Sequence, residues 1–365
     1  MGVLLTTLLY NVPLISYSFR KSNSGMTMHF SKLCMVGLAS IEAPHVISSA
    51  SLEQQLEPVI QRLGLKSDII EHLTGIVNRK FWDRGVQPSD VATQAAEKAL
   101  SKSGINRDEI GLLISTSVCK DYIEPSVASL VHGNLQLDPE CMNFDLGNAC
   151  LAFVNAIGVA GNMIEKGQID YALIVDGEGS RFAIEETMKR LMAEGCSEEE
   201  FRGNFATLTL GSGAAAMILS NTDLHPQAPK ILGSVSLAAT EHNRLCVGQS
   251  DEMTTDANSL LVAGLKLAKT TYNKAKKELC WEEKKFAQYI LHQVSHIHTL
   301  RLCRQVGIDP NLVFRIFPQF GNIGPASIPI ALDQYLQKNT VPGGERVALL
   351  GIGSGINCAM MEMLW

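Results

Sequence analysis

The stretch Gly147–Phe153, with the sequence GNACLAF, decides how the rest of the chain is interpreted. Residues 141–146 before it predict a short buried strand, and residues 151–164 after it are apolar on nearly every face, as in a helix inside a large core. Cys150 would therefore open a buried helix, where unpaired amides and the helix dipole favour a thiolate. This context alone supports two interpretations of Cys150 equally, a nucleophile and an inert thiol, because free cysteine is among the most buried residue types.

Composition narrows the class of protein. The chain has 365 residues, of which 46% are hydrophobic and 19% charged, which is typical of a globular protein with a large core. Thirty glycines and short apolar runs such as 112–114 and 173–175 favour an α/β fold. A net charge of −6 argues against nucleic acid as a partner. Nine cysteines without a C-x-x-C pair favour a reduced, cytoplasmic location over a disulfide framework or a zinc site.

We expect residues 1–30 to be an N-terminal extension, disordered or upstream of a natural start at Met26 or Met28. Residues 2–19 are mostly apolar, but Asn11 and Pro13 interrupt a run that is already short for a membrane span. A membrane anchor or signal segment is the alternative, and we expect membrane association only through this extension.

The remaining chain contains an internal duplication, with halves at residues 31–220 and 221–365. Predicted elements recur in the same order: the strand 288–294 matches 111–118, the helix 299–306 matches 126–135, and the strand 346–351 matches 171–177. Gly321-Asn322 opens an apolar helix as Gly147-Asn148 does. Two such copies packed about a pseudo-twofold axis would bring both Gly-Asn turns to one shared site.

Two further residues suit chemistry at that site. His292 lies near the C-terminal end of its predicted strand, where α/β sheets place ligands, and Asn322 lies on the second turn. A cysteine nucleophile with two neutral hydrogen-bond donors suits acyl transfer through a thioester. His292, His296 and His298 do not predict a metal site, because their spacing straddles a strand end. No G-x-G-x-x-G follows a strand, which argues against a dinucleotide site.

Several other segments have clear patterns. We predict helices at 51–63, 67–73, 89–103, 184–200 and 259–278, and strands at 31–39, 206–219 and 231–239. Residues 75–83 predict a loop with two cations and two aromatic rings, among them Arg79 and Trp82. Such a loop suits a phosphorylated aromatic group, although a solvated turn explains it equally well.

The motifs together resemble a known family. Residues 148–153, 291–293, 321–329 and 351–355 resemble the Cys-His-Asn condensing enzymes of the thiolase superfamily, of the ketoacyl synthase III type. Residues 43–45, 121–126, 147–153 and 353–358 are more closely similar to the OleA-type long-chain acyl-CoA condensing enzymes. The resemblance extends from Ser31 to the C-terminus.

The resemblance implies an α/β fold of two duplicated βαβαβαββ halves in five α-β-α-β-α layers, assembled as a homodimer. It implies a non-decarboxylative Claisen condensation of two long-chain acyl-CoAs through an acyl-Cys150, giving a 2-alkyl-3-keto acid for olefin or long-chain ketone biosynthesis. Coenzyme A thioesters are then the substrates, bound in part by Arg79 and Trp82, and no cofactor is needed. Downstream lipid-biosynthesis enzymes are possible partners.

The resemblance also gives the site residues their roles. Cys150 carries the acyl group, and its amide with the turn Gly353, Ser354 and Gly355 forms an oxyanion hole. His292 and Asn322 hold the second thioester carbonyl, and Glu124 from the dimer partner removes the α-proton. A plain surface carboxylate is the alternative for Glu124.

Departures from the wider pattern bear on the substrate. Residues 292–295 read HQVS instead of HQAN, and residues 322–324 read NIG instead of NTS, which argues against a malonyl-carrier substrate. His296 replaces a common arginine, which weakens the case for a phosphate or carrier contact there. Two alternatives stay open: an acyltransferase or acyl-CoA hydrolase using the same cysteine, and a non-catalytic scaffold subunit of an acyl-modifying complex.

Overall fold

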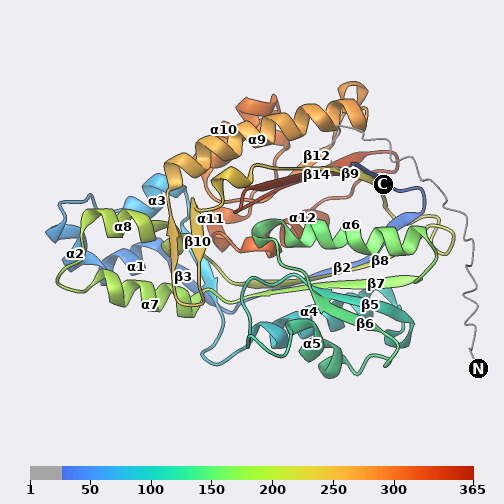
Figure 1. Ribbon diagram of the computed structural model, residues 1–365, viewed down its shortest axis with the longest axis horizontal. Helices are drawn as coiled ribbons and strands as arrows, with labels where there is room; N and C mark the ends of the chain where they lie inside the picture. The colour runs from blue at the N-terminus through green and yellow to red at the C-terminus, as the bar shows by residue number, and fades with distance from the viewer. Residues whose placement is uncertain (1–26) are drawn as a thin grey trace, which may run out of the picture.

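A computed structural model describes residues 27–365 and shows two sheets that alternate with three layers of helices (Figure 1). The two sheets are joined into one ten-stranded sheet through a single residue pair, Cys34 with Lys230. Helices α6 (Ala152–Glu165) and α12 (Ser327–Lys338) lie between the sheets and carry most of the central core. Helices α4 (Pro88–Ser103) and α5 (Val127–Leu135) cover one outer face, and α9 (Ala257–Glu278) and α10 (His296–Val306) cover the other. This is the predicted five-layer arrangement.

The sheet of the first half has the strand order β6-β5-β7-β8-β2. Strand β5 runs parallel to β6 and β7, whereas β8 runs antiparallel to both β7 and β2. The strands are β2 (Leu33–Glu42), β5 (Ile110–Ser115), β6 (Met142–Asp145), β7 (Tyr171–Glu178) and β8 (Gly213–Asn221).

The second half repeats this topology with the order β12-β13-β14-β9. Strands β12 and β13 are parallel and the other pairs are antiparallel. Beyond β12, Val313 makes a single parallel bridge to Tyr289, in the place that β6 occupies in the first half. The strands are β9 (Lys230–Ala238), β12 (Gln288–Leu291), β13 (Arg346–Gly353) and β14 (Asn357–Leu364). The topology confirms the duplication predicted from the sequence.

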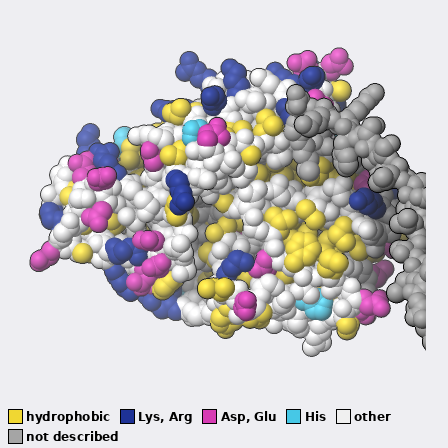
Figure 2. Space-filling view, in the orientation of Figure 1, with side chains coloured by type: hydrophobic (Ala, Val, Ile, Leu, Met, Phe, Trp, Pro, Cys, Tyr) yellow, Lys and Arg dark blue, Asp and Glu magenta, His cyan; other side chains and the backbone are white. Residues whose placement is uncertain are grey.

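Strand β6 forms where we predicted a short buried strand, but it lies at the edge of the sheet and is only partly buried. Within residues 27–365 it pairs only with β5, and its first residue, Met142, is 55% exposed. Figure 2 shows hydrophobic side chains gathered on the surface over the region of α6 and β6. Of the exposed hydrophobic residues, Val159 lies on α6 and Met142 on β6.

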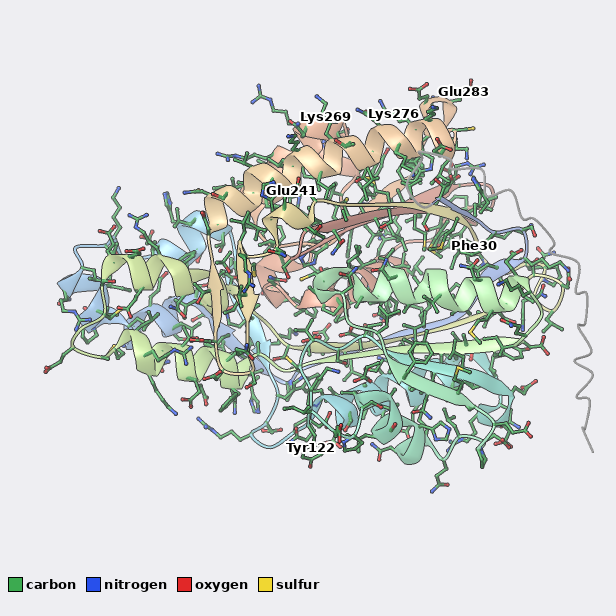
Figure 3. The ribbon with its side chains drawn as sticks, in the orientation of Figure 1. Phe30, Tyr122, Glu241, Lys269, Lys276 and Glu283 are labelled. Carbon is green, nitrogen blue, oxygen red and sulfur yellow. The ribbon has the colours of Figure 1, made fainter. Side chains whose placement is uncertain are left out.

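The fold begins before residue 31. Strand β1 (Thr27–His29) pairs with β9 of the second half, and Phe30 is buried. Figure 3 places Phe30 beside α6, where a side chain at Gly161 would contact its ring. The extension that we placed at residues 1–30 therefore does not include residues 27–30, and its remainder lies outside the described residues.

A lobe of five short helices packs around its own core at one end of the molecule (Figure 1). The predicted helix 51–63 is divided after Gln55, because Pro58 lacks the N–H that would continue it. The predicted helix 184–200 is likewise two helices. The five are α1 (Ser49–Gln55), α2 (Glu57–Arg62), α3 (Ile69–Thr74), α7 (Arg181–Leu191) and α8 (Glu198–Asn204).

Two small two-stranded sheets and a short helix complete the fold. The predicted loop 75–83 contains strand β4 (Asn78–Phe81), which pairs with β3 (His45–Ser48) across the intervening helices α1 to α3. The second small sheet is a hairpin of β10 (Cys246–Gly248) and β11 (Met253–Thr255), and α11 is Phe317–Phe320. In the predicted strand 206–219, the strand begins only at Gly213 and a 3-10 turn, η3 (Phe205–Thr209), comes first. No helix within residues 27–365 is both long and apolar enough to span a bilayer.

Candidate active site

Cys150 lies in a 3-10 turn, η2 (Ala149–Leu151), between β6 and α6. The turn follows a sharp change of chain direction, since Ala149 has a positive φ of 46° that L side chains rarely adopt. The amide of Leu151 donates to the carbonyl of Asn148 and closes the turn at 3.1 Å. Local geometry therefore presents Cys150 ahead of the central helix.

The turn at Gly353–Gly355 lies against the Cys150 turn. A Cβ atom at Gly353 would come within 3.0 Å of the Asn148 carbonyl oxygen and 3.2 Å of the Leu151 nitrogen. Asn357 donates its side-chain amide to Asn148 Oδ1 at 3.0 Å, and Asn148 in turn donates to Asn155 on α6 at 2.6 Å. These contacts fix the two turns relative to each other, as an oxyanion hole shared between them requires.

Asn322 is held by backbone hydrogen bonds to the first half. Its N–H donates to the Thr209 carbonyl at 2.9 Å, and its carbonyl accepts from Gly211 N at 2.8 Å. A Cβ atom at Gly211 would lie only 1.7 Å from the Phe320 carbonyl oxygen, so no larger residue fits there without moving the chain. The Oδ1 of Asn322 accepts from Gly324 N at 3.2 Å, which leaves the side-chain NH₂ as the group that can donate to a ligand.

His292 follows β12 and continues its pairing, because its N–H donates to the Leu350 carbonyl of β13 at 2.9 Å. The next residue, Gln293, is fully buried and anchors the segment: its side chain accepts from Ile316 N and donates to the Phe314 carbonyl. Burial lowers the pKa of His292 to about 3, with a smaller effect of nearby His298, and contact with the Gly324 backbone opposes the change. The imidazole is therefore neutral near pH 7.

Gly324 connects the components of the site. It lies in the 3-10 turn η7 (Gly324–Ala326), which packs against η2 and against β7. His292 and Asn322 both interact with its backbone. The structure thus brings together the Cys150, His292 and Asn322 segments at one place between the two halves, as the duplication predicted.

The predicted low-pKa thiolate is wrong for the resting site. Burial raises the pKa of Cys150 to about 12, and the charge of Glu178 adds to this effect. Cys150 lies in a 3-10 turn directly before α6, and the loss of water on burial is the largest cause of its raised pKa. Cys150 is therefore a thiol near pH 7.

Glu124 is not near this cluster in the described protomer. It lies on an exposed loop between β5 and α5, directly after Tyr122 and Ile123, which are 57% and 98% exposed. Figure 3 shows Tyr122 at the outer surface of the molecule.

Arg79 and Trp82 are buried instead of offering a surface loop to a ligand. Arg79 is 0% exposed and donates to Ser49 Oγ at 3.1 Å, and burial lowers its pKa to about 10. Trp82 donates its indole N–H to the carbonyl of Glu178 at 2.9 Å. Both side chains are buried and make their hydrogen bonds inside the protein, which argues against direct contact with coenzyme A.

Glu178, at the end of β7, was not predicted from the sequence. Its carboxylate is buried, accepts from Val118 N at 2.6 Å and Cys119 N at 3.3 Å, and lies 3.7 Å from the Cβ position of Gly324. The sequence does contain a pattern that could have indicated it. Residues 175–178 read VDGE, which places two carboxylates, at alternate positions, at the C-terminal end of a predicted buried strand. Among residues 27–365 no group of three or more His, Cys, Asp or Glu could hold a metal.

A cysteine at the first of two equivalent turns, with a neutral histidine and an amide of the second half at the adjoining turn, is the arrangement of a condensing enzyme of the thiolase type. The family described as 3-oxoacyl-[acyl-carrier-protein (ACP)] synthase III matches residues 144–239, and its C-terminal family matches residues 277–365. The first match contains Cys150, and the second contains His292 and Asn322.

Two similar proteins assign the chain to a narrower family within this class of enzymes. An acyl-CoA:acyl-CoA alkyltransferase of Xanthomonas campestris pv. campestris is 48% identical over 338 residues, which cover 93% of this chain and all of the relative. One from Shewanella oneidensis is 33% identical over 350 residues, with the same coverage. The chain therefore belongs to the acyl-CoA:acyl-CoA alkyltransferases, the OleA family.

Solved structures agree with this assignment. Xanthomonas campestris OleA with cerulenin bound has a TM-score of 0.91 at 48% identity, and the match covers 93% of this chain and 98% of that one. A variant of the same protein with bound lauric acid and lauroyl-CoA has a TM-score of 0.90 and covers 92% and 100%.

Proposed function

We propose that this protein joins two long-chain acyl-CoAs by a non-decarboxylative Claisen condensation through an acyl group on Cys150. The observation that carries the proposal is the convergence of the Cys150, His292 and Asn322 segments on Gly324, in a chain 48% identical to an acyl-CoA:acyl-CoA alkyltransferase. Coenzyme A thioesters are the substrates, and none of the steps below needs a further cofactor.

In the first stage the Cys150 sulfur attacks the thioester carbonyl of one acyl-CoA. The developing oxyanion is held by the Cys150 amide and the turn at Gly353, Ser354 and Gly355, which the contacts with Asn148 hold in place. Coenzyme A leaves and the acyl group stays on Cys150. Lauroyl-CoA bound to a relative supports thioesters of long acyl chains as donors.

In the second stage His292 and Asn322 donate to the carbonyl oxygen of the second acyl-CoA. Both are neutral donors, because burial keeps the pKa of His292 near 3, and neutral donors stabilise an enolate without protonating it. The enolate carbon attacks the acyl group on Cys150. The product is a 2-alkyl-3-keto thioester, which hydrolysis turns into a 2-alkyl-3-keto acid for olefin or ketone biosynthesis.

Glu124 of a second protomer serves as the base that forms the enolate. The cysteine, glutamate and histidine replaced in solved variants of Xanthomonas OleA are separated along that chain by the same numbers of residues as Cys150, Glu124 and His292 here. The edge strand β6 and the exposed Tyr122 and Ile123 beside Glu124 provide an apolar surface for a homodimer. We place the protein in the cytoplasm, where acyl-CoA and downstream lipid-biosynthesis enzymes meet.

Two variants test the separate roles of Cys150 and Glu124, with palmitoyl-CoA as substrate. Cys150→Ala removes the acyl acceptor, so release of CoA is expected to stop. Glu124→Ala keeps the acceptor, so one equivalent of CoA is released and palmitoyl-Cys150 is found by mass spectrometry, without a carbon–carbon bond. Condensation product from either variant refutes the assignment.

The same assay separates the alternatives. CoA and free fatty acid from the wild type, without condensed product, would mean a hydrolase, and transfer of the acyl group to a carrier would mean an acyltransferase. A wild-type protein that never becomes acylated would mean a scaffold subunit.

A further inference from the structure

Glu178 is a buried carboxylate without a cation to balance it. It is 5% exposed at the end of β7, and no ion pair reaches it within the described part of the chain. Its partners are the amides of Val118 and Cys119 and the thiol of Cys119. Burying a carboxylate in this way costs stability, which favours a functional role for Glu178 at this site.

The position of Glu178 links it to both halves of the site. Its Cδ atom lies 3.7 Å from the Cβ position of Gly324, the residue whose backbone also contacts His292 and Asn322. A Cβ atom at position 324 would be in ordinary van der Waals contact with the carboxyl group. The turn that contains Gly324 packs against the turn that contains Cys150, so Glu178 lies beside the junction of the two turns.

The charged and titratable groups around Glu178 are few. Asp176 lies two residues earlier on the same face of β7, and burial, then the charge of Glu178, raises its pKa well above the usual value. Thr116 donates to Asp176 at 2.5 Å. Burial also raises the pKa of Cys119. Cys119 thus keeps its proton, and His292 is neutral, near pH 7.

Glu178 differs from these neighbours, because burial raises its pKa only to about 7 while three hydrogen bonds from Val118 and Cys119 oppose the change. Its charge in turn is the second cause, after burial, of the high pKa of Cys150. Glu178 is therefore the group around the nucleophile that changes charge near neutral pH.

We propose that Glu178 and Cys150 share one proton, with Glu178 acting as the residue that holds the proton of the nucleophile. In the resting enzyme the proton is on the Cys150 sulfur. When acyl-CoA is attacked, the S–H bond breaks and an O–H bond forms at Glu178. The Cys150 S–C bond then forms and the C–S bond to CoA breaks, with its electron pair leaving on the CoA sulfur.

The second stage returns the proton. As the enolate carbon bonds to the acyl carbon, the Cys150 S–C bond breaks and the departing thiolate takes its proton back from Glu178. This role rests on the proposed function for its place in the reaction, but the ionisation itself is measurable without any acyl-CoA. Failure of one is therefore distinguishable from failure of the other.

Shared protonation gives a distinctive pH profile for alkylation of Cys150 by iodoacetamide, followed peptide by peptide by mass spectrometry. In the wild type the rate rises up to about pH 7, where Glu178 ionises, and then levels off. In Glu178→Gln no charge opposes the thiolate, so the rate continues to rise about tenfold per pH unit. The variant matches the wild type at pH 6 and is about tenfold faster at pH 8.

Exposed Cys280 in the same samples is an internal reference for the reagent. Glu283→Gln is the matched control, because Glu283 is exposed in the 3-10 turn after the C-terminal end of α9 (Figure 3), and it keeps the wild-type profile. If Glu178→Gln does not fold, the wild-type profile alone decides. A wild-type rate without a plateau, or a Glu178→Gln profile that superimposes on the wild type or lies below it at every pH, overturns the proposal.

Discussion

Cys150 and His292 are both held in neutral forms by burial, with the pKa of the thiol raised to about 12 and that of the imidazole lowered to about 3. Residue types and their order predicted that these side chains would react together. Their ionisation was not predictable, because it depends on how much water the folded chain removes around each group. Glu178 was missed for the same reason: a strand sequence alone does not tell a buried carboxylate from one at a solvated strand end.

The buried charge of this single residue, Glu178, predicts that the stability of the protein depends on pH. The carboxyl ionises near pH 4.5 in the unfolded chain and near pH 7 in the folded protein. The unfolded state therefore loses its proton first, and stability falls as pH rises through this range. Glu178→Gln removes the effect and is expected to be roughly 3 kcal/mol more stable than the wild type at pH 8, with little difference at pH 4.

Urea unfolding at the two pH values measures the difference, with Glu283→Gln as the exposed control. Equal pH dependence of the unfolding free energy in the wild type and Glu178→Gln would show that burial of the Glu178 carboxylate does not destabilise the folded protein.

Among the elements, the Gly-Asn turns and the parallel strands of each half were predictable from the sequence. Gly147-Asn148 and Gly321-Asn322 follow a common pattern, and the structure gives β12 and β13 the places of β5 and β7. A strand before Cys150 was also predicted, but its expected burial was wrong, because the apolar pattern of β6 does not show that it lies at a sheet edge. The loop expected at 75–83 was wrong because the pairing of β4 with β3 is a contact distant in sequence.

The contact between the Asn322 turn and the residues before β8 predicts a steric requirement at Gly211. Gly211→Ala places a Cβ atom 1.7 Å from the Phe320 carbonyl oxygen, so the Asn322 turn must move. We expect a loss of about 2 kcal/mol or more in unfolding free energy. Turnover should fall at least about tenfold, because displaced donors no longer meet the enolate oxygen.

Gly133→Ala on α5 is the control, since nothing lies within 4 Å of its Cβ position. Alanine within a helix is expected to leave turnover unchanged and to stabilise the protein by up to about 1 kcal/mol. Wild-type turnover in Gly211→Ala would show that the position of the Asn322 turn does not matter.

For the whole molecule, one protomer contains Cys150, His292 and Asn322 but keeps Glu124 on an exposed surface loop. The proposed homodimer predicts that Glu124 removes the α-proton of the substrate bound at the partner's Cys150 site. Cys150→Ala and Glu124→Ala homodimers are each expected to be inactive. Mixed and re-equilibrated, they form hybrid dimers in which one site has both an intact Cys150 and an intact Glu124, so about a quarter of wild-type activity returns at equal proportions by random pairing.

Condensation is measured in the mixture and in each variant alone. No recovery in a mixture that size exclusion and labelled protomers show to contain hybrids would contradict action across the interface. Recovery requires two protomers and therefore also tests the dimer.

The central claim is that two acyl-CoAs become joined carbon to carbon through Cys150. The most direct measurement is to incubate the wild-type protein with palmitoyl-CoA alone, let the 2-alkyl-3-keto acid lose carbon dioxide, and look for the symmetrical ketone by mass spectrometry. We predict that ketone accumulates with the release of two CoA molecules per ketone, and that Cys150→Ala gives none. Release of CoA with free palmitate and without ketone would contradict the account.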